Sequence, residues 1–163
     1  HQIPSADRLC CYEANVQTFY GTNMTPQLNR HNEGIWSSLE GMVRNLANTS
    51  DTTYVVTGCI VNGSTKFTED SDGKRMTVPV AYYKALLRNS KSSTISTWAA
   101  AAFYTEHKDY GNYVPFKELA MSIDELEEII GLDLFVNLPA KLGEERAAEL
   151  EAEDPTKNSI WGL

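Results

Sequence analysis

The sequence lacks any long hydrophobic run. Its most apolar candidates are the mixed segments 54–61 and 98–103, well short of the roughly 20 apolar residues that a transmembrane helix needs. We therefore expect no membrane partner. Linkers rich in Gly, Ser or Pro and internal repeats are also missing, which predicts one domain over residues 1–163. A hydrophobic content of 42% in 163 residues is enough to bury a core.

Positive charge is scarce as well. With 14 Lys and Arg against 22 Asp and Glu, the formal net charge is -8 at pH 7, which argues against a broad surface that coats nucleic acid. Part of the negative charge lies in residues 143–154, within a segment, 140–163, that we expect to be an acidic helical tail. An enzyme that holds a few phosphates locally is still compatible, because a metal ion and a few arginines create a positive site inside an acidic protein.

Cysteines are few. Cys10, Cys11 and Cys59 lack the paired spacing of a zinc site, and adjacent cysteines do not bridge each other easily. The number and spacing of the cysteines leave open a disulfide from Cys59 to Cys10 or Cys11. They also leave open whether the protein is a reduced cytoplasmic protein or an exported one.

Helix signals are present at two places. Residues 1–31 are expected to be irregular, because prolines and a glycine interrupt any period. The next apolar residues recur at the spacing of one helix face and predict an amphipathic helix over about residues 31–48: Trp36, Leu39, Val43 and Leu46. A short helix is predicted after Ser122, because Ser122 and Glu125 have capping-box spacing and Gly131 supplies a stop.

Between the two helices lie three segments typical of β-strands, at residues 53–61, 75–87 and 96–105. The residues between the first two, 68–74, have the composition of a turn. Strands that are grouped between helices, rather than alternating with them, predict an α+β fold.

Residues 23–40, NMTPQLNRHNEGIWSSLE, concentrate neutral amides before the first predicted helix. If that helix begins near Asn32, Glu40 lies about 12 Å further along its axis, so the two side chains cannot both touch one ion directly. A hard divalent cation held by one amide oxygen, and keeping most of its waters, would let Glu40 act through a water. Mg²⁺ tolerates this arrangement because it dehydrates reluctantly.

Each of these helix residues also has an ordinary structural explanation. Asn32 is a preferred residue for an N-cap, which would make its role purely structural. Glu40 and Arg44 have the spacing of a surface ion pair on one helix face, a pair that contributes only ~0.2–0.5 kcal/mol.

The same applies before the helix. Asn23 and Gln27 flank Pro26 as turn residues often do. His31 is expected to be exposed at the helix entrance, and His107 to lie in a loop. No single residue here identifies a function.

The order of several motifs along the whole chain is more specific. These are HQIPSADR (1–8), NMTPQ (23–27), NEGIWSSLEGMVR (32–44), TGCIV (57–61), VPVAYYKALL (78–87) and SIDELEEIIGLDLFVNLP (122–139). Over residues 1 to about 139 the chain resembles the sugar-nonspecific DNA/RNA endonucleases, also called ββα-metal or His-Me finger nucleases. This resemblance implies the ββα-metal nuclease fold, a mixed sheet with flanking helices, with the N-terminal part of the domain missing from this chain.

The resemblance also implies roles for individual residues. His1 matches the general base that takes a proton from the attacking water. Asn32 matches the single protein ligand of Mg²⁺, with Mn²⁺ or another divalent cation as alternatives, and Glu40 matches the residue that orients metal-bound water. Arg44 matches the arginine that contacts the scissile phosphate.

Asn23 and Gln27 match polar residues that line the same cleft and contact substrate. The family role implies an explanation for the many amides, because they hold water, metal and phosphate oxygens without adding charge that repels the substrate.

The function implied is Mg²⁺-dependent, nonspecific hydrolysis of DNA and RNA to 5′-phosphorylated fragments, in a secreted or periplasmic enzyme that could form a homodimer. Two alternatives stay open. One is a catalytically inactive nuclease-like binding or structural module. The other is a fragment that is active only with its missing N-terminal segment, because the residues that precede the motif histidine in the family are absent here.

Overall fold

The computed structural model describes residues 1–91, 96–111 and 113–163. The chain forms two compact units. Unit 1 contains His1–Arg44, Thr57–Tyr82 and Thr105–Val114, and unit 2 contains Asn45–Val56, Tyr83–Tyr104 and Pro115–Leu163. Within these described ranges no helix is both long and apolar enough to cross a membrane. Helices and strands are both present and follow the predicted α+β order.

The N-terminal part of unit 1 is helical rather than irregular. Its elements are η1 (Ser5–Asp7), α1 (Tyr12–Gln17), η2 (Gly21–Asn23), α2 (Asn29–His31), η3 (Asn32–Trp36) and α3 (Ser37–Asn48). Helix α1 was not predicted, and it has no capping side chain that could have marked its start. On the predicted amphipathic helix, Trp36, Leu39 and Val43 are buried, as their spacing indicates.

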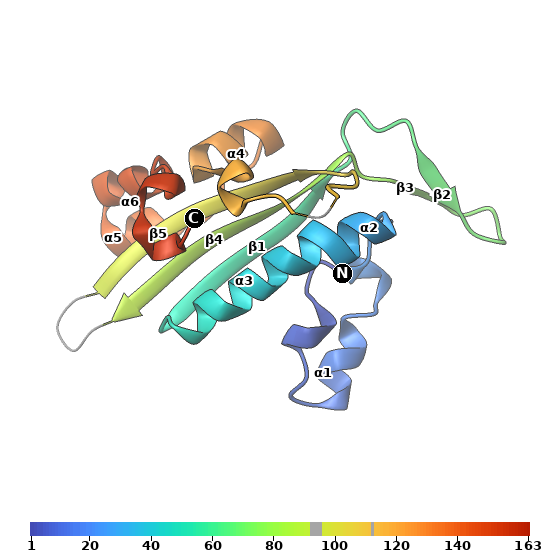
Figure 1. Cartoon of the computed structure of the whole chain (residues 1–163), viewed down its shortest axis with the longest axis horizontal. Helices are drawn as coiled ribbons and strands as arrows, with labels where there is room; N and C mark the ends of the chain where they lie inside the picture. Colours follow the sequence, from blue (N-terminus) through green and yellow to red (C-terminus); the bar gives the residue numbers. More distant parts are fainter. Residues whose placement is uncertain (92–95, 112) are drawn as a thin grey trace. The chain divides into compact units, whose positions relative to one another are not determined.

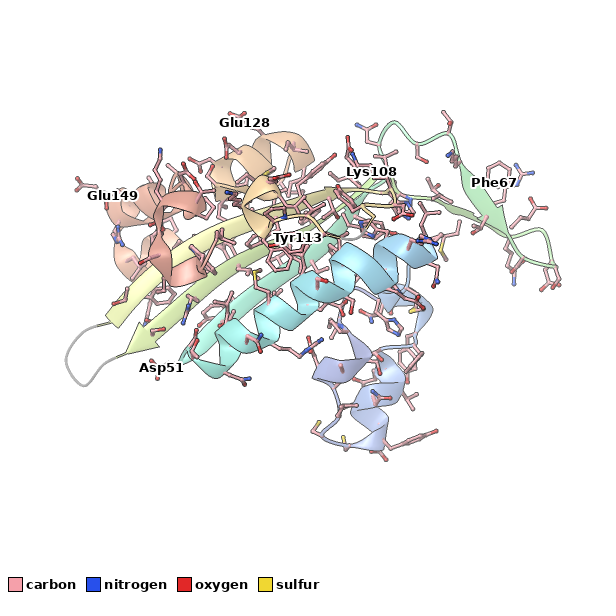
Figure 2. All side chains as sticks on the ribbon, viewed as in Figure 1. Asp51, Phe67, Lys108, Tyr113, Glu128 and Glu149 are labelled. Carbon is pink, nitrogen blue, oxygen red and sulfur yellow. The ribbon has the colours of Figure 1, made fainter. Side chains whose placement is uncertain are left out.

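A hairpin follows in unit 1, drawn in green in Figure 1. Strand β2 (Phe67–Glu69) pairs antiparallel with β3 (Arg75–Thr77). Residues 70–74 of the predicted turn lie between them, where Asp70 Oδ1 accepts the N–H groups of Asp72 and Lys74, whereas Thr68 and Glu69 belong to β2, a strand that was not predicted. Figure 2 labels Phe67 on this hairpin, and the guanidinium of Arg75 lies 4.2 Å from the centre of the Phe67 ring.

The larger sheet has the strand order β1-β4-β5-β6. Its strands are β1 (Thr52–Ile60), β4 (Ala81–Lys91), β5 (Ser96–Glu106) and β6 (Ala120–Met121). Strands β5 and β6 are antiparallel, with Ala102 opposite Met121. The predicted strand 75–87 is corrected to two strands, β3 and β4. Pro79 lies in the break between them, and it has no N–H for a sheet hydrogen bond.

Unit 2 contains the C-terminal helices. They are η4 (Phe116–Glu118), α4 (Ile123–Ile130), α5 (Leu138–Leu142), α6 (Glu144–Glu151), η5 (Pro155–Lys157) and η6 (Ser159–Trp161), with α5 against α6 (Figure 1). Helix α4 has the predicted ends. Ser122 Oγ accepts the Glu125 N–H, Glu125 Oε2 accepts the Ser122 N–H, and Gly131 ends the helix at a φ of 69°. Helix α6 confirms a helix in the acidic tail.

All three cysteines are free thiols in the structure. Cys10 and Cys11 are exposed, and Cys59 is half-buried. No bridge joins Cys59 to either of the other two.

Candidate active site

All the predicted site residues lie in unit 1, within residues 1–44. Three of them follow one another along two helical pieces that meet at a kink at Gly34. Asn32, the predicted metal ligand, precedes the kink, whereas Glu40 and Arg44, the predicted water-orienting carboxylate and phosphate-binding arginine, lie after it on α3.

The kink lies within η3, at Gly34, whose φ of -94° and ψ of -109° are outside the helical range. The carbonyl of Gly34 accepts two hydrogen bonds, one from the backbone N–H of Ser37 and one from Ser38 Oγ. Kinks of this kind occur where a glycine interrupts the regular hydrogen bonding of a helix.

The structure corrects the predicted start of the helix. The first helical residue is Asn29, and the backbone N–H of Asn32 already donates to the carbonyl of Leu28, 2.9 Å away. Asn32 has helical backbone angles, with φ -62° and ψ -52°, so it is not an N-cap. A structural role as an N-cap therefore does not explain Asn32.

The side chain of Asn32 is half-buried, and no hydrogen-bond partner for its amide is found among the residues that the structure describes. Because the residue is also partly exposed, water can bind this amide, and its oxygen is accessible to a ligand. The metal-binding role expected for Asn32 stays a prediction.

The donor set fits a hard cation that keeps most of its water. Among the described residues, no group of three or more His, Cys, Asp or Glu side chains is placed to hold a metal ion. A cage made of protein ligands alone is therefore not formed there. One neutral amide oxygen, with the carboxylate of Glu40 beyond the kink on α3, is the oxygen-only, incomplete ligand set that suits Mg²⁺.

Arg44 forms an ion pair with Asp7, and its Nη1 lies 2.9 Å from Asp7 Oδ1. Both side chains are about one-third exposed, at 37% and 31%. The sequence motifs did not single out Asp7, because nothing in residues 1–8 shows which helix that segment meets. One of the five N–H donors of Arg44 serves Asp7, so the guanidinium retains donors for a phosphate.

His1 is half-buried. Its ring meets the Phe19 ring edge-on, with 4.9 Å between the centres and 88° between the planes. The residues that follow it are fixed by Asn23. Asn23 Oδ1 accepts the Ile3 N–H, and Asn23 Nδ2 donates to the carbonyls of Ile3 and Thr18, all within 2.8–2.9 Å. The carbonyl of Asn23 also accepts the Gln2 N–H.

The amide of Asn23 thus binds backbone groups of its own chain, and it holds the segment that carries His1. The predicted contact of Asn23 with substrate stays a prediction. Sequence could not show this clamp, because Asn23 and Ile3 lie 20 residues apart in the chain.

Gln27 is partly exposed and contacts His31. Gln27 Nε2 lies 2.7 Å from His31 Nδ1, and His31 Nε2 lies 3.0 Å from Thr105 Oγ1. The prediction that His31 is exposed is wrong, because its exposed fraction is 0%. Burial, and next the neighbouring His107, lower the pKa of His31 from 6.5 to about 4. Gln27 therefore touches a neutral imidazole at neutral pH.

His107 directly follows strand β5, so the loop predicted for it is confirmed. Its ring lies edge-on to the His31 ring, with the centres 5.4 Å apart. Two of the three histidines in the sequence thus share one cluster with Tyr82, whose ring centre is 5.2 Å from each. This cluster was not predicted, because its residues lie far apart in the sequence.

Comparison with known proteins relates this chain to nucleases. Residues 1–141 match a family described as DNA/RNA non-specific endonuclease. The mitochondrial nuclease 1 of Schizosaccharomyces pombe is 25% identical over 148 residues, which cover 85% of this chain and 46% of that protein. The mitochondrial nuclease EXOG of Homo sapiens is 27% identical over 149 residues, covering 85% and 39%.

A nuclease of Nostoc sp. is 33% identical over 144 residues, which cover 85% of this chain and 50% of that protein. The chain thus spans half or less of the length of these three relatives. Two of them carry the word mitochondrial in their names, and the secretion expected from the resemblance stays a prediction.

The fold is similar to that in the crystal structure of an EndoG/EndoGI complex. The TM-score is 0.69 at 23% identity, covering 83% of this chain and 57% of that chain. The predicted ββα-metal fold class is confirmed by this likeness.

Proposed function

The chain belongs to the DNA/RNA non-specific endonuclease family, and we propose on that basis that it is a Mg²⁺-dependent endonuclease that hydrolyses the phosphodiester backbone of DNA and RNA. The proposed products are 5′-phosphorylated fragments. Such an enzyme needs little base or sugar preference, because contacts to the phosphate backbone carry no sequence information.

One observation carries the proposal. The half-buried Asn32 amide has no hydrogen-bond partner among the described residues, and it lies just before the kink at Gly34 that leads into α3, which carries Glu40 and Arg44. An inactive binding module has no need for an amide without a partner at a distorted helical turn. A hydrolase that holds a hydrated cation there does.

Asn32 would bind Mg²⁺ directly, and Glu40 would orient water at the same place. When bound, Mg²⁺ supplies Lewis-acid stabilisation of charge on the phosphate and on the leaving oxygen. Arg44 contributes a fixed positive charge, which favours the phosphate most when its negative charge increases in the transition state. Before substrate binds, Asp7 partly neutralises the charge of Arg44 and restricts the movement of its side chain.

His1 is proposed to take the proton from the attacking water. An imidazole suits this role because it titrates near neutral pH. The base must also lie within hydrogen-bond reach of the water, and small misplacements of about 1 Å can lower the rate ~10²-fold. The hydrogen bonds that Asn23 accepts from the backbone of Gln2 and Ile3 limit how far His1 can move from such a position.

The test is cleavage of supercoiled plasmid and of single-stranded RNA in Mg²⁺, with and without EDTA. The purified chain and the same chain extended by the residues encoded upstream of His1 are assayed side by side. We expect EDTA-sensitive cleavage of both substrates, with fragments whose 5′ ends polynucleotide kinase labels only after alkaline phosphatase has removed their phosphate. Cleavage by neither protein, or cleavage that EDTA does not stop, would overturn the proposal.

A further inference from the structure

The residues Thr25–Leu28, here called the strap, connect the two parts of the candidate site in unit 1. Asn23, which holds the segment next to His1, lies just before the strap, and the helical segment that carries Asn32 begins just after it. The position of the strap therefore affects both the proposed base and the proposed metal ligand.

The first half of the strap is bound by Tyr82. Tyr82 is 1% exposed, and its hydroxyl donates to the carbonyl of Pro26 over 2.7 Å and lies 3.1 Å from Thr25 Oγ1. Gln2 Nε2 donates to the same Thr25 oxygen from the other side, over 3.1 Å. The residue next to His1 is thus tied to the strap.

The second half of the strap is bound by the two clustered histidines. Gln27 contacts His31, and the backbone N–H of Leu28 donates to His107 Nε2 over 2.7 Å. The carbonyl of Leu28 accepts the N–H of Asn32 over 2.9 Å. Leu28 therefore connects His107 to Asn32 through its own two backbone groups.

The ring of His107 can serve Leu28 in one tautomer. His107 Nδ1 lies 2.7 Å from the carbonyl oxygen of Pro79, which only accepts hydrogen bonds, so Nδ1 carries the proton. Nε2 is then the bare nitrogen that accepts the Leu28 N–H. The backbone N–H of His107 also donates to the carbonyl of Val80 over 2.8 Å, which fixes the residue at the end of β5.

From this geometry we infer that His107 is a positioning residue for the proposed nuclease site, holding the Leu28 N–H so that the first turn of the helix presents Asn32 in a fixed orientation. The inference rests on the proposed function for its catalytic consequence. Its structural part, the link from His107 through Leu28 to Asn32, is independent of any activity.

His107 is a practical residue to replace. It is half-buried and lines a cavity of about 280 Å³ together with Leu28, Lys66 and Pro79, among others, so water can enter when the ring is changed. His107→Phe keeps a ring and removes both nitrogens. His107→Gln is the conservative variant, because its amide oxygen can accept the Leu28 N–H.

Leu28→Pro removes the same hydrogen bond from the other partner. The φ of Leu28 is -60°, which a proline ring adopts, and the Leu28 side chain is 50% exposed. The substitution deletes the N–H without straining φ at this position, and its ring also restricts the backbone of Gln27, the residue before it. If His107 acts through Leu28, the double variant H107F/L28P should behave like either single variant.

The first measurement is hydrogen exchange of individual backbone amides, which needs no activity. In His107→Phe the amides of Leu28 and Asn32 should exchange at least about tenfold faster, while the amides of α4 in unit 2 keep their rates. His107→Gln should restore most of the protection. Unchanged exchange at Asn32 in His107→Phe would overturn the inference.

The second measurement is Mn²⁺ affinity by electron paramagnetic resonance, paired with the Mg²⁺ concentration that gives half-maximal cleavage. Residues that orient a metal ligand typically change affinity or activity about 10–100-fold. We expect a loss of that size in His107→Phe and Leu28→Pro, no further loss in the double variant, and an unchanged KM for DNA. Faster exchange with unchanged Mn²⁺ affinity would mean a purely structural role and would also overturn the inference.

Two outcomes keep this inference and the proposed function separate. If His107→Phe does not fold, Leu28→Pro decides the same question by exchange of the Asn32 amide and by Mn²⁺ affinity. If the unsubstituted protein cleaves no nucleic acid in any form, the proposed function fails. Amide exchange and Mn²⁺ affinity then still decide whether His107 positions Asn32.

Discussion

Arg44 and Asp7 are joined by an ion pair with 2.9 Å between Nη1 and Oδ1. The pair ties the middle of helix α3 to η1, in the segment that follows His1. Because both side chains are about one-third exposed, solvent screens the pair and its contribution to stability is small, below ~1 kcal/mol. Its importance is therefore in aligning Arg44 rather than in stabilising the fold.

Arg44→Met should lower turnover at least roughly tenfold, which corresponds to ~1.4 kcal/mol of lost transition-state stabilisation. The unfolding free energy should change by less than ~1 kcal/mol. Arg30→Met is a matched control, since Arg30 also pairs with an aspartate, Asp109, and is more exposed at 80%. Equal losses of turnover in both variants would show that Arg44 has no special contact with substrate.

Asn32→Ala should remove nuclease activity without lowering stability. An N-cap at this position would have made the substitution cost about 0.5–2 kcal/mol. Asn32 instead lies inside the helical segment, where Ala is favoured over Asn by up to about 0.7 kcal/mol. Urea unfolding and Mg²⁺-dependent cleavage are measured together, with Asn29→Ala as the control. Full activity at saturating Mg²⁺ would rule out the ligand assignment.

Glu40→Gln keeps the shape of the side chain and removes its charge. If Glu40 orients a water, turnover should fall at least roughly tenfold, with little change in the unfolding free energy. Glu33→Gln is the control, because Glu33 is exposed next to the kink and pairs with Asn29. A change in stability with unchanged turnover would indicate an ordinary surface contact for Glu40.

Asn23→Ala distinguishes a clamp from a substrate contact. Loss of three hydrogen bonds to backbone groups should destabilise the fold by about 1–3 kcal/mol and let His1 move. A clamp predicts a lower kcat with a nearly unchanged KM, whereas a residue that binds substrate predicts a raised KM. Steady-state kinetics on a short duplex measure both. A raised KM with an unchanged kcat would instead support direct contact of Asn23 with substrate.

His31 makes stability depend on pH. Its folded pKa, about 4, lies below its ordinary value of 6.5, so between these values the unfolded chain binds a proton that the folded chain does not. Stability from this residue is complete above pH 6.5 and is lost as the pH falls toward 4, by up to about 3 kcal/mol. Urea unfolding of the protein and of His31→Gln should show a weaker acid dependence in the variant. Identical dependence would contradict a neutral, buried His31.

Local signals in the sequence were sufficient where a few neighbouring residues decide the structure. Ser122, Glu125 and Gly131 specify both ends of α4 without help from the rest of the chain. Trp36, Leu39 and Val43 likewise predict a buried helix face, because periodicity is a local property.

Features that depend on distant partners were not predictable in this way. His31 is buried because Thr105, 74 residues away in the sequence, supplies a polar partner that lets an imidazole leave water. His107 meets Leu28 across 79 residues. Asn32 was expected to be a helix start, since a single sequence gives no sign that Leu28 accepts its N–H or that a kink follows at Gly34.

The kink at Gly34 also sets the angle between the helical residues before it, which include Asn32, and helix α3, which carries Glu40 and Arg44. A chain that lacks Gly34 alone would keep all three side chains, yet the two helical pieces would meet at a different angle and Asn32 would point in another direction relative to the other two. The number of residues at this kink is therefore as constrained as any side chain it carries, and we expect substitutions there to be tolerated better than a deletion of one residue.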